Sequence, residues 1–172
     1  MKILKTIKDK DLGSDLKDPI FYTQERKASR AVVSDKNKNI ALLYIKNKGY
    51  HKLPGGGSKE GEDILDTLKR EVTEEIGCKI VNIKEIGIVE EFRNYFSLHQ
   101  LSFCFTADLD GEKGVSQFEA DEIEDGFETV WMGIHDAIKT LESERELEHY
   151  EGKFINVRDL LILKEARDSI LD

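Results

Sequence analysis

The order of elements expected from the sequence predicts an α/β fold in which helices cover a central mixed β-sheet. Short apolar runs of strand length lie on both sides of one segment with helical periodicity, and two further helix-like segments follow near the end of the chain. A length of 172 residues suits one domain with a substantial hydrophobic core. We therefore expect a single domain over residues 1–172.

The first part of the chain is expected to supply strands. Residues 1–25 are charged and weakly patterned, and we assign them to an N-terminal strand or arm. The apolar runs at 30–35 and 39–46 flank the polar residues 36–38, which predicts a hairpin. Residues 53–57, Leu-Pro-Gly-Gly-Gly, then interrupt regular structure.

A helix is expected from about residue 63 to residue 76. Its apolar residues recur at helical spacing, namely Leu65, Leu68, Val72 and Ile76. Gly77 follows at the position of a C-terminal cap. This apolar stripe can dock on the sheet while the acidic edge of the helix faces a cleft.

Three carboxylates share the charged side of this helix. Residues three and four apart are neighbours on a helix surface, so Glu71, Glu74 and Glu75 form one acidic cluster. At about 100° per residue, Glu71 and Glu75 flank the apolar stripe and Glu74 lies further out. Because like charges this close destabilise a helix, the cluster is expected to bind a counterion, and a divalent cation is the obvious candidate.

The second half of the chain supplies more strands and then helices. Strand-like runs cover 80–92, 101–109 and 129–132, and the middle run is rich in aromatic and β-branched residues. The acidic segment 110–127 is expected to be a loop. Helical periodicity covers 134–141 and 157–170.

Charge and cysteine content exclude several classes of partner. A formal net charge of −9 without a basic cluster argues against a nucleic-acid polymer. Cys78 and Cys104 stand in apolar contexts without metal-ligand spacing, which favours reduced thiols and a cytoplasmic protein. The start of the chain lacks the apolar core of a signal peptide, and no run is long enough to span a membrane.

The segment from Gly56 to Cys78, GGSKEGEDILDTLKREVTEEIGC, resembles the Nudix box, G-x5-E-x7-R-E-U-x-E-E-x-G-U with U aliphatic. Every fixed letter of the box is present, at Gly56, Glu62, Arg70, Glu71, Glu74, Glu75 and Gly77. Val72 fills the first aliphatic position, and Cys78 is a small apolar substitute in the last. The resemblance implies the Nudix fold, an α/β/α sandwich around a mixed sheet.

The resemblance also implies a metal site and catalytic roles. In Nudix hydrolases the matching glutamates bind Mg²⁺ or Mn²⁺, here Glu71, Glu74 and Glu75, and the carbonyl matching Gly56 often completes the shell. Arg70, Glu71 and Glu74 are the expected catalytic residues. Arg70 would hold a glutamate by a salt bridge, and which glutamate is the general base differs between family members.

Substrate-binding residues are expected on both sides of the box. Gly57 lets the backbone approach a phosphate, since glycine adds no steric hindrance, and Glu62 is expected to support the geometry of the loop and helix. Tyr95 lies where dinucleoside-polyphosphate hydrolases often place a tyrosine. A further carboxylate is expected from the acidic segment before Trp131, for which Glu122 and Asp125 are the candidates.

The predicted activity is Mg²⁺-dependent hydrolysis, by water, of the phosphoanhydride bond in a nucleoside diphosphate linked to a group X. Such catalysis needs positioning and charge neutralisation, which carboxylate-bound Mg²⁺ supplies. A nucleoside triphosphate or related small-molecule nucleotide is the first candidate, because the proline typical of ADP-ribose hydrolases, about fifteen residues after the box, is absent.

Several alternatives stay open from the sequence. An ADP-ribose or dinucleoside-polyphosphate hydrolase, a non-catalytic nucleotide-binding sensor, an isomerase-like relative acting on another diphosphate, or a structural protein with an acidic helix would share parts of this pattern. The non-catalytic members usually lose one of the box glutamates, whereas this chain keeps all of them. The strand edges also leave room for a homodimer.

Overall fold

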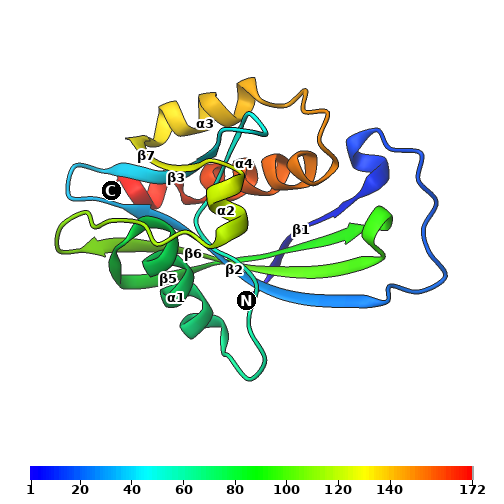
Figure 1. The fold of residues 1–172 in the computed structure, drawn as a ribbon, viewed down its shortest axis with the longest axis horizontal. Coiled ribbons are helices and arrows are strands. Elements are labelled where there is room, and N and C mark those ends of the chain that lie inside the picture. The colour runs from blue at the N-terminus through cyan, green and yellow to red at the C-terminus, as the bar shows by residue number, and fades with distance from the viewer. Residues whose placement is uncertain (172) are drawn as a thin grey trace.

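The computed structural model describes residues 1–171 and contains a seven-stranded mixed sheet between two layers of helices (Figure 1). The strands are β1 (Ile3–Lys8), β2 (Gln24–Ser34), β3 (Asn39–Ile45), β4 (Tyr50–Lys52), β5 (Lys79–Arg93), β6 (Leu98–Asp110) and β7 (Phe127–Gly133). The helices are α1 (Ile64–Ile76), α2 (Ala120–Glu124), α3 (Ile134–Ser143) and α4 (Tyr150–Leu171), with short 3₁₀ turns at Asp9–Leu12 and Asn94–Phe96.

The sheet has the strand order β1-β5-β6-β2-β3-β4, and β7 pairs with β3. The pairs β1·β5 and β2·β6 are parallel, and the other pairs are antiparallel. A single pair, Ser34 with Ile40, links β2 to β3, after which β3 pairs with β7 and β4. The parallel pairing of β2 with β6 covers eleven residues and brings the start of β2 beside residues far away in the sequence.

Two hydrophobic cores lie on opposite faces of this sheet. Because successive side chains of a strand point to opposite faces, Ala31 and Val33 of β2 pack with α1, whereas Val32 packs with α3 and α4. In Figure 1, α1 lies below the sheet and α3 and α4 lie above it. The predicted α/β/α sandwich with a central mixed sheet is confirmed.

Helix α1 has the ends that the sequence predicts. The carboxylate of Asp63 accepts a hydrogen bond from the backbone N–H of Asp66 at 2.8 Å and caps the start of the helix. Gly77 ends the helix in the left-handed region with φ of 67°, and its N–H donates to the carbonyl of Thr73. The hairpin and the strand and helix segments predicted after the box are also present, within a few residues at most ends.

Strand β4, helix α2 and the first turns of α4 were not predicted. Residues 50–52 form β4, which is too short to give a periodic signal. The acidic segment 110–127 is not only a loop, because it contains the single-turn helix α2. Helix α4 begins at Tyr150 rather than near residue 157, and Gly152 obscures its first turns in the sequence, although that glycine is buried against Tyr50. No helix within residues 1–171 combines the length and apolar character that a membrane span requires.

Candidate active site

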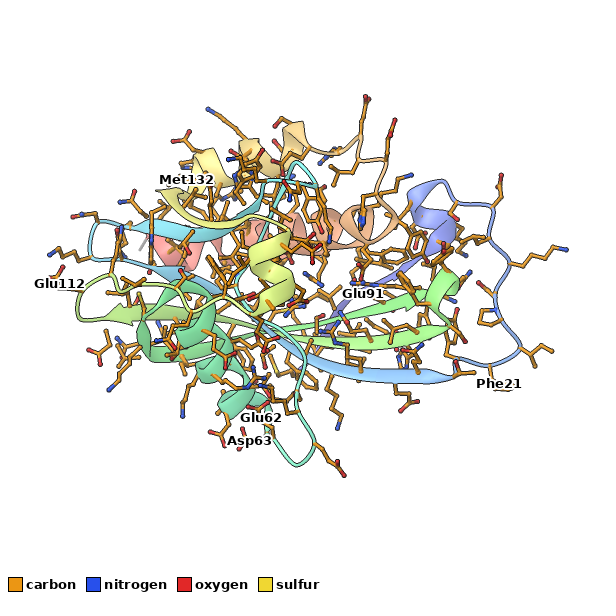
Figure 2. The ribbon with its side chains drawn as sticks, in the orientation of Figure 1. Phe21, Glu62, Asp63, Glu91, Glu112 and Met132 are labelled. Carbon is orange, nitrogen blue, oxygen red and sulfur yellow. The ribbon has the colours of Figure 1, made fainter. Side chains whose placement is uncertain are left out.

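A cleft of about 450 Å³ lies where the loop 53–63 leads into α1. One wall of the cleft is acidic and is formed by Glu71, Glu74 and Glu75 of α1 together with Glu119, Asp121 and Glu122 near α2. Gly55, Gly56 and Gly57 form part of its floor. The predicted metal-binding residues therefore lie together in one cavity. Figure 2 labels Glu62 and Asp63, at the start of α1.

Arg70 joins the carboxylates of the box to the preceding loop. Its Nη1 contacts Glu71 Oε1 at 2.8 Å and Glu74 Oε2 at 2.9 Å. Its Nε and Nη2 donate to the two carboxylate oxygens of Glu62 at 2.8 and 2.9 Å, and Nη2 also donates to the carbonyl of Gly57 at 3.1 Å. The paired hydrogen bonds between Arg70 and Glu62 fix the orientation of these two side chains as well as the distance between them.

Glu62 is a supporting residue in this geometry. Besides the two bonds from Arg70, its carboxylate accepts hydrogen bonds from the Lys59 N–H and the Thr67 hydroxyl, each at 3.0 Å. These contacts, the Arg70 bonds first, lower the pKa of Glu62 to about 2. Glu62 therefore carries a charge that Arg70 already neutralises, and it ties the loop to the first turns of α1.

Glu75 is the deepest carboxylate of the box. Its side chain is 1% exposed, its Oε1 lies 2.8 Å from Lys52 Nζ, and its Oε2 accepts a hydrogen bond from the backbone N–H of Gly55. Burial raises the pKa of Glu75, although Lys52 and the Gly55 N–H act in the opposite direction. The β4 residue Lys52 thus provides a positive charge next to the predicted metal ligand, a contact that sequence reasoning missed.

Gly56 is required by the position of the Glu71 carboxylate. A Cβ atom at residue 56 would lie 2.3 Å from Glu71 Oε1, which no side chain can satisfy without displacing that carboxylate. The carbonyl of Gly56 accepts a hydrogen bond from the Ser29 N–H at 3.0 Å, which fixes the loop on β2. Glycine at this position lets the loop and the acidic side of α1 come into contact.

The remaining predicted residues divide into two groups. Gly57 and Glu122 line the cleft, and burial raises the pKa of Glu122. Asp125 does not line the cleft and forms an ion pair with Lys48 instead. Tyr95 also lies outside the cleft, 69% exposed, where its ring packs against Phe96 and Tyr150. The roles given to these residues from the sequence stay predictions.

Four arginines that the sequence analysis did not single out also line the cleft and form its basic wall: Arg26, Arg30, Arg93 and Arg158. A sequence signal for them does exist. Arg30 is two residues before the core residue Val32, so it points to the sheet face that α4 covers. A polar residue on the same strand face as core residues indicates a buried polar site. The other residues of that site come from other strands and helices, so the sequence does not identify them.

The oxygen-rich acidic wall fits a hard divalent cation. Mg²⁺ takes carboxylates, carbonyls and water as ligands, and Glu71, Glu74, Glu75 and the Gly56 carbonyl offer that set around one loop and one helix edge. Within the described residues, no three His, Cys, Asp or Glu side chains converge as a metal cage. Arg70 and Lys52 contact these carboxylates instead, so a cation binding there would replace or share those contacts.

Comparison with known proteins defines the class to which this fold and site belong. The family model described as the NUDIX domain matches residues 24–155, which is most of the chain. The chain therefore belongs to the NUDIX domain family, whose enzymes are Nudix hydrolases, pyrophosphohydrolases of phosphoanhydrides. The family predicted from the sequence is confirmed.

Individual relatives agree with this assignment. The mouse (Mus musculus) protein "Nucleoside diphosphate-linked moiety X motif 6" is 41% identical over 84 residues, which cover 48% of this chain and 24% of the mouse protein. The chain thus matches only about a quarter of the length of that curated relative.

Solved structures of bacterial proteins share the fold. A NUDIX hydrolase from Nitrosomonas europaea is 15% identical with a TM-score of 0.64, and the match covers 85% of this chain and 90% of that protein. A MutT protein from Bacillus halodurans is 24% identical with a TM-score of 0.54, covering 67% and 72%. A MutT NUDIX hydrolase from Burkholderia pseudomallei is 21% identical, also with a TM-score of 0.54, covering 65% and 85%.

Proposed function

We propose that this chain is a divalent-metal-dependent pyrophosphohydrolase that cleaves a phosphoanhydride bond of a small nucleotide by water attack. A nucleoside diphosphate linked to a group X, with a nucleoside triphosphate as the first candidate, is the proposed substrate class. The observation that carries the proposal is the close contact of Glu71 with Gly56 at a cleft that also contains Glu74 and Glu75. The glycine and the glutamates of the box thus lie close together in the fold and also have the expected spacing in the sequence.

The proposed chemistry assigns a task to each residue of the box. Glu71, Glu74, Glu75 and the Gly56 carbonyl would hold Mg²⁺ or Mn²⁺, which offsets the charge of the phosphoryl oxygens and lowers the pKa of bound water. Arg70 orients Glu71 and Glu74 through the hydrogen bonds described above. A box carboxylate without a metal bond would accept the proton of the attacking water.

Glu122 is a candidate for an additional carboxylate in the cleft, whereas Glu75 is already part of the box. Glu122 lines the cleft on the side of α2, and we propose it as the additional carboxylate from the acidic segment. Asp125 is paired with Lys48 outside the cleft and is the weaker candidate for the same role. The ion pair of Glu75 with Lys52 keeps this buried carboxylate compatible with an ionised state.

The setting of the enzyme is also a proposal. Cys78 and Cys104 are buried free thiols, which supports a reducing, cytoplasmic environment. A small-molecule nucleotide is the expected partner, and nucleic-acid polymers are disfavoured by the net charge of −9. A homodimer stays a prediction.

The test is a product-release assay over a panel of nucleoside triphosphates, oxidised nucleoside triphosphates, ADP-ribose, nucleotide sugars and dinucleoside polyphosphates. Each substrate is incubated with the protein in Mg²⁺, in Mn²⁺ and in EDTA. We expect metal-dependent turnover of at least one substrate class, with a phosphorylated product from each side of the cleaved bond. Saturable nucleotide binding without turnover in either metal would contradict the proposal and identify a non-catalytic nucleotide sensor.

A further inference from the structure

The basic wall of the cleft has no task in the hydrolysis proposed above. It consists of the four guanidinium groups of Arg26 and Arg30 on β2, Arg93 on β5 and Arg158 on α4, which we call the arginine cluster. Placing several like charges at one interior site is costly unless anions compensate them. The cluster therefore needs a physical explanation, and its surroundings in the structure suggest one.

Three members of the cluster are buried and lack part of their hydrogen bonding. The exposed fractions of Arg30, Arg93 and Arg158 are 5%, 2% and 0%. Within the described residues, Arg30 Nε, Arg93 Nε and Arg158 Nη2 are buried without a hydrogen-bond partner. Buried polar groups are normally satisfied, so these donors at the wall of a cavity point to an acceptor that enters the cleft from outside.

Within the described residues, direct ion pairs to the cluster involve only Arg93 and Arg158. Glu91 Oε1 lies 2.9 Å from Arg93, and its Oε2 lies 3.4 Å from Arg158. Arg158 also contacts Asp159 at 2.7 Å, and Arg93 contacts Glu151 at 3.2 Å. These three carboxylates contact two of the four guanidinium groups, those of Arg93 and Arg158. Figure 2 labels Glu91, which lies on strand β5.

The excess positive charge belongs to Arg26 and Arg30. Among residues 1–171, neither of their guanidinium groups has a carboxylate within 4.0 Å, and Arg30 Nη1 donates only to the carbonyl of Ser29 at 2.8 Å. Burial, followed by the charges of Arg158 and Arg26, lowers the pKa of Arg30 to about 10. An anion beside Arg26 and Arg30 would relieve this repulsion.

The cluster lies directly against the glycine loop of the box. A Cβ atom at Gly57 would lie 2.7 Å from Arg26 Nε, and one at Gly55 would lie 3.0 Å from the Cα of Arg30. The backbone N–H of Leu53, at the start of the same loop, donates to Asp159 Oδ2 at 2.8 Å, which ties the loop to α4. A substrate whose diphosphate is bound by the box would therefore extend onto the arginines.

The lining of the cleft does not suit a base or another apolar group. Among the described residues that line it, Ile155 is the one large apolar side chain, and none is aromatic. Pockets for bases normally contain aromatic or apolar surfaces for stacking. Guanidinium groups instead match the geometry of phosphate oxygens and bind them with paired hydrogen bonds.

We infer that the arginine cluster is a subsite for a phosphate group beyond the scissile diphosphate, so that the preferred substrates carry at least one additional phosphate. This inference rests on the proposed function, because it places the extra phosphate relative to the box. The base or other neutral part of such a substrate would lie at the mouth of the cleft rather than in its interior.

The experiment has a binding arm that needs neither metal nor hydrolysis. Inorganic phosphate is titrated into the metal-free protein by calorimetry, for wild type, Arg26→Gln and Arg30→Lys. Arg26 is exposed, so its replacement should not disturb folding. Arg30→Lys keeps the positive charge but removes the paired N–H donors of the guanidinium group. We expect affinity to fall about tenfold to a hundredfold in both variants. The matched control is Arg145→Gln, an exposed arginine outside the cleft, which should bind like wild type.

The second arm compares hydrolysis of ATP and ADP in Mg²⁺, two substrates that differ by one phosphate. Wild type should prefer ATP in kcat/KM, and Arg26→Gln should reduce this preference about tenfold or more. Phosphate binding that depends on Arg26 and Arg30 without any hydrolysis would sustain the subsite and contradict the proposed function. Hydrolysis of both nucleotides together with phosphate binding equal in all variants would overturn the subsite and leave the hydrolase standing.

Discussion

Gly56 sets how closely the Glu71 carboxylate can approach the loop of the box. Replacing Gly56 by Ala places a Cβ atom 2.3 Å from a Glu71 oxygen, so the carboxylate must move. Since a misplacement of about 1 Å at a reacting site can cost about a hundredfold in rate, we expect kcat/KM to fall by that order in Gly56→Ala. Steady-state kinetics on the best substrate measure the change.

A second glycine provides the control for this substitution. Gly133 precedes α3 with φ of −60°, and a Cβ atom there meets nothing closer than 3.9 Å. Gly133→Ala should therefore keep full activity. Equal activity of Gly56→Ala and wild type would show that Glu71 does not need its place beside the loop.

The box residues were predictable individually, whereas the arginine cluster was not. Fixed spacing along one loop and one helix places Arg70 within reach of Glu62, Glu71 and Glu74, because these contacts span eight residues or fewer. Arg30 and Arg158 come together only through the register of β2 in the sheet and the docking of α4. The local sequence pattern does not show which distant residues the sheet and α4 bring together.

The start of α1 depends on the Asp63 cap. Loss of the hydrogen bond to the Asp66 N–H in Asp63→Ala should reduce the free energy of unfolding by about 1 kcal/mol, whereas Asp63→Asn should retain most of it. Urea unfolding of the two variants and wild type measures the difference. Equal stability of Asp63→Ala and Asp63→Asn would mean that the cap does not stabilise the helix.

The elements that escaped prediction share a physical cause. Strand β4 has three residues and α2 has five, so each spans less than two periods of its pattern and gives no repeating signal. Tertiary contacts hold both elements in place. Strand β4 pairs with β3 and its Lys52 contacts Glu75, and in α2 the carbonyl of Glu124 accepts a hydrogen bond from the Asn47 side chain. Longer elements such as α1 and β6 carry enough periodicity to be located from the sequence alone.

The buried network around Glu91 connects strands β5 and β6 to α4 and makes stability depend on pH. Burial alone would raise the pKa of Glu91, but Arg93 and Arg158 outweigh it and lower the pKa to about 2. On acidification the unfolded chain therefore takes up the proton first. The stabilisation, on the order of 3 kcal/mol, is present above pH of about 4.5 and is lost as the pH falls towards 2.

Glu91→Gln tests this pH dependence. At neutral pH the variant should be less stable than wild type by about 3–5 kcal/mol, because two buried arginines lose a charged partner. The difference between wild type and variant should shrink between pH 4.5 and pH 2. Urea unfolding at several pH values measures it, with the exposed Glu165→Gln as control. A difference that stays constant over this range would contradict the role given to Glu91.

The overall architecture followed from the sequence because order and periodicity of the elements restrict an α/β chain to few arrangements. The strand order and the parallel pairing of β1 with β5 did not follow, since strands of similar composition give no signal for their neighbours. The acidic wall of the cleft was predicted from the box, and the basic wall became visible only when β2, β5 and α4 were assembled.

The most direct test of the central claim is the Mg²⁺-dependent rate of Glu75→Gln on the best-cleaved substrate, beside wild type and Glu165→Gln. Glu75 is buried at the bottom of the acidic wall, so removing its charge removes a proposed metal ligand with little change in shape. We predict that kcat/KM falls by at least about a hundredfold in Glu75→Gln, and that Glu165→Gln matches wild type. Metal-dependent turnover at the wild-type rate in a folded Glu75→Gln would contradict catalysis at this site.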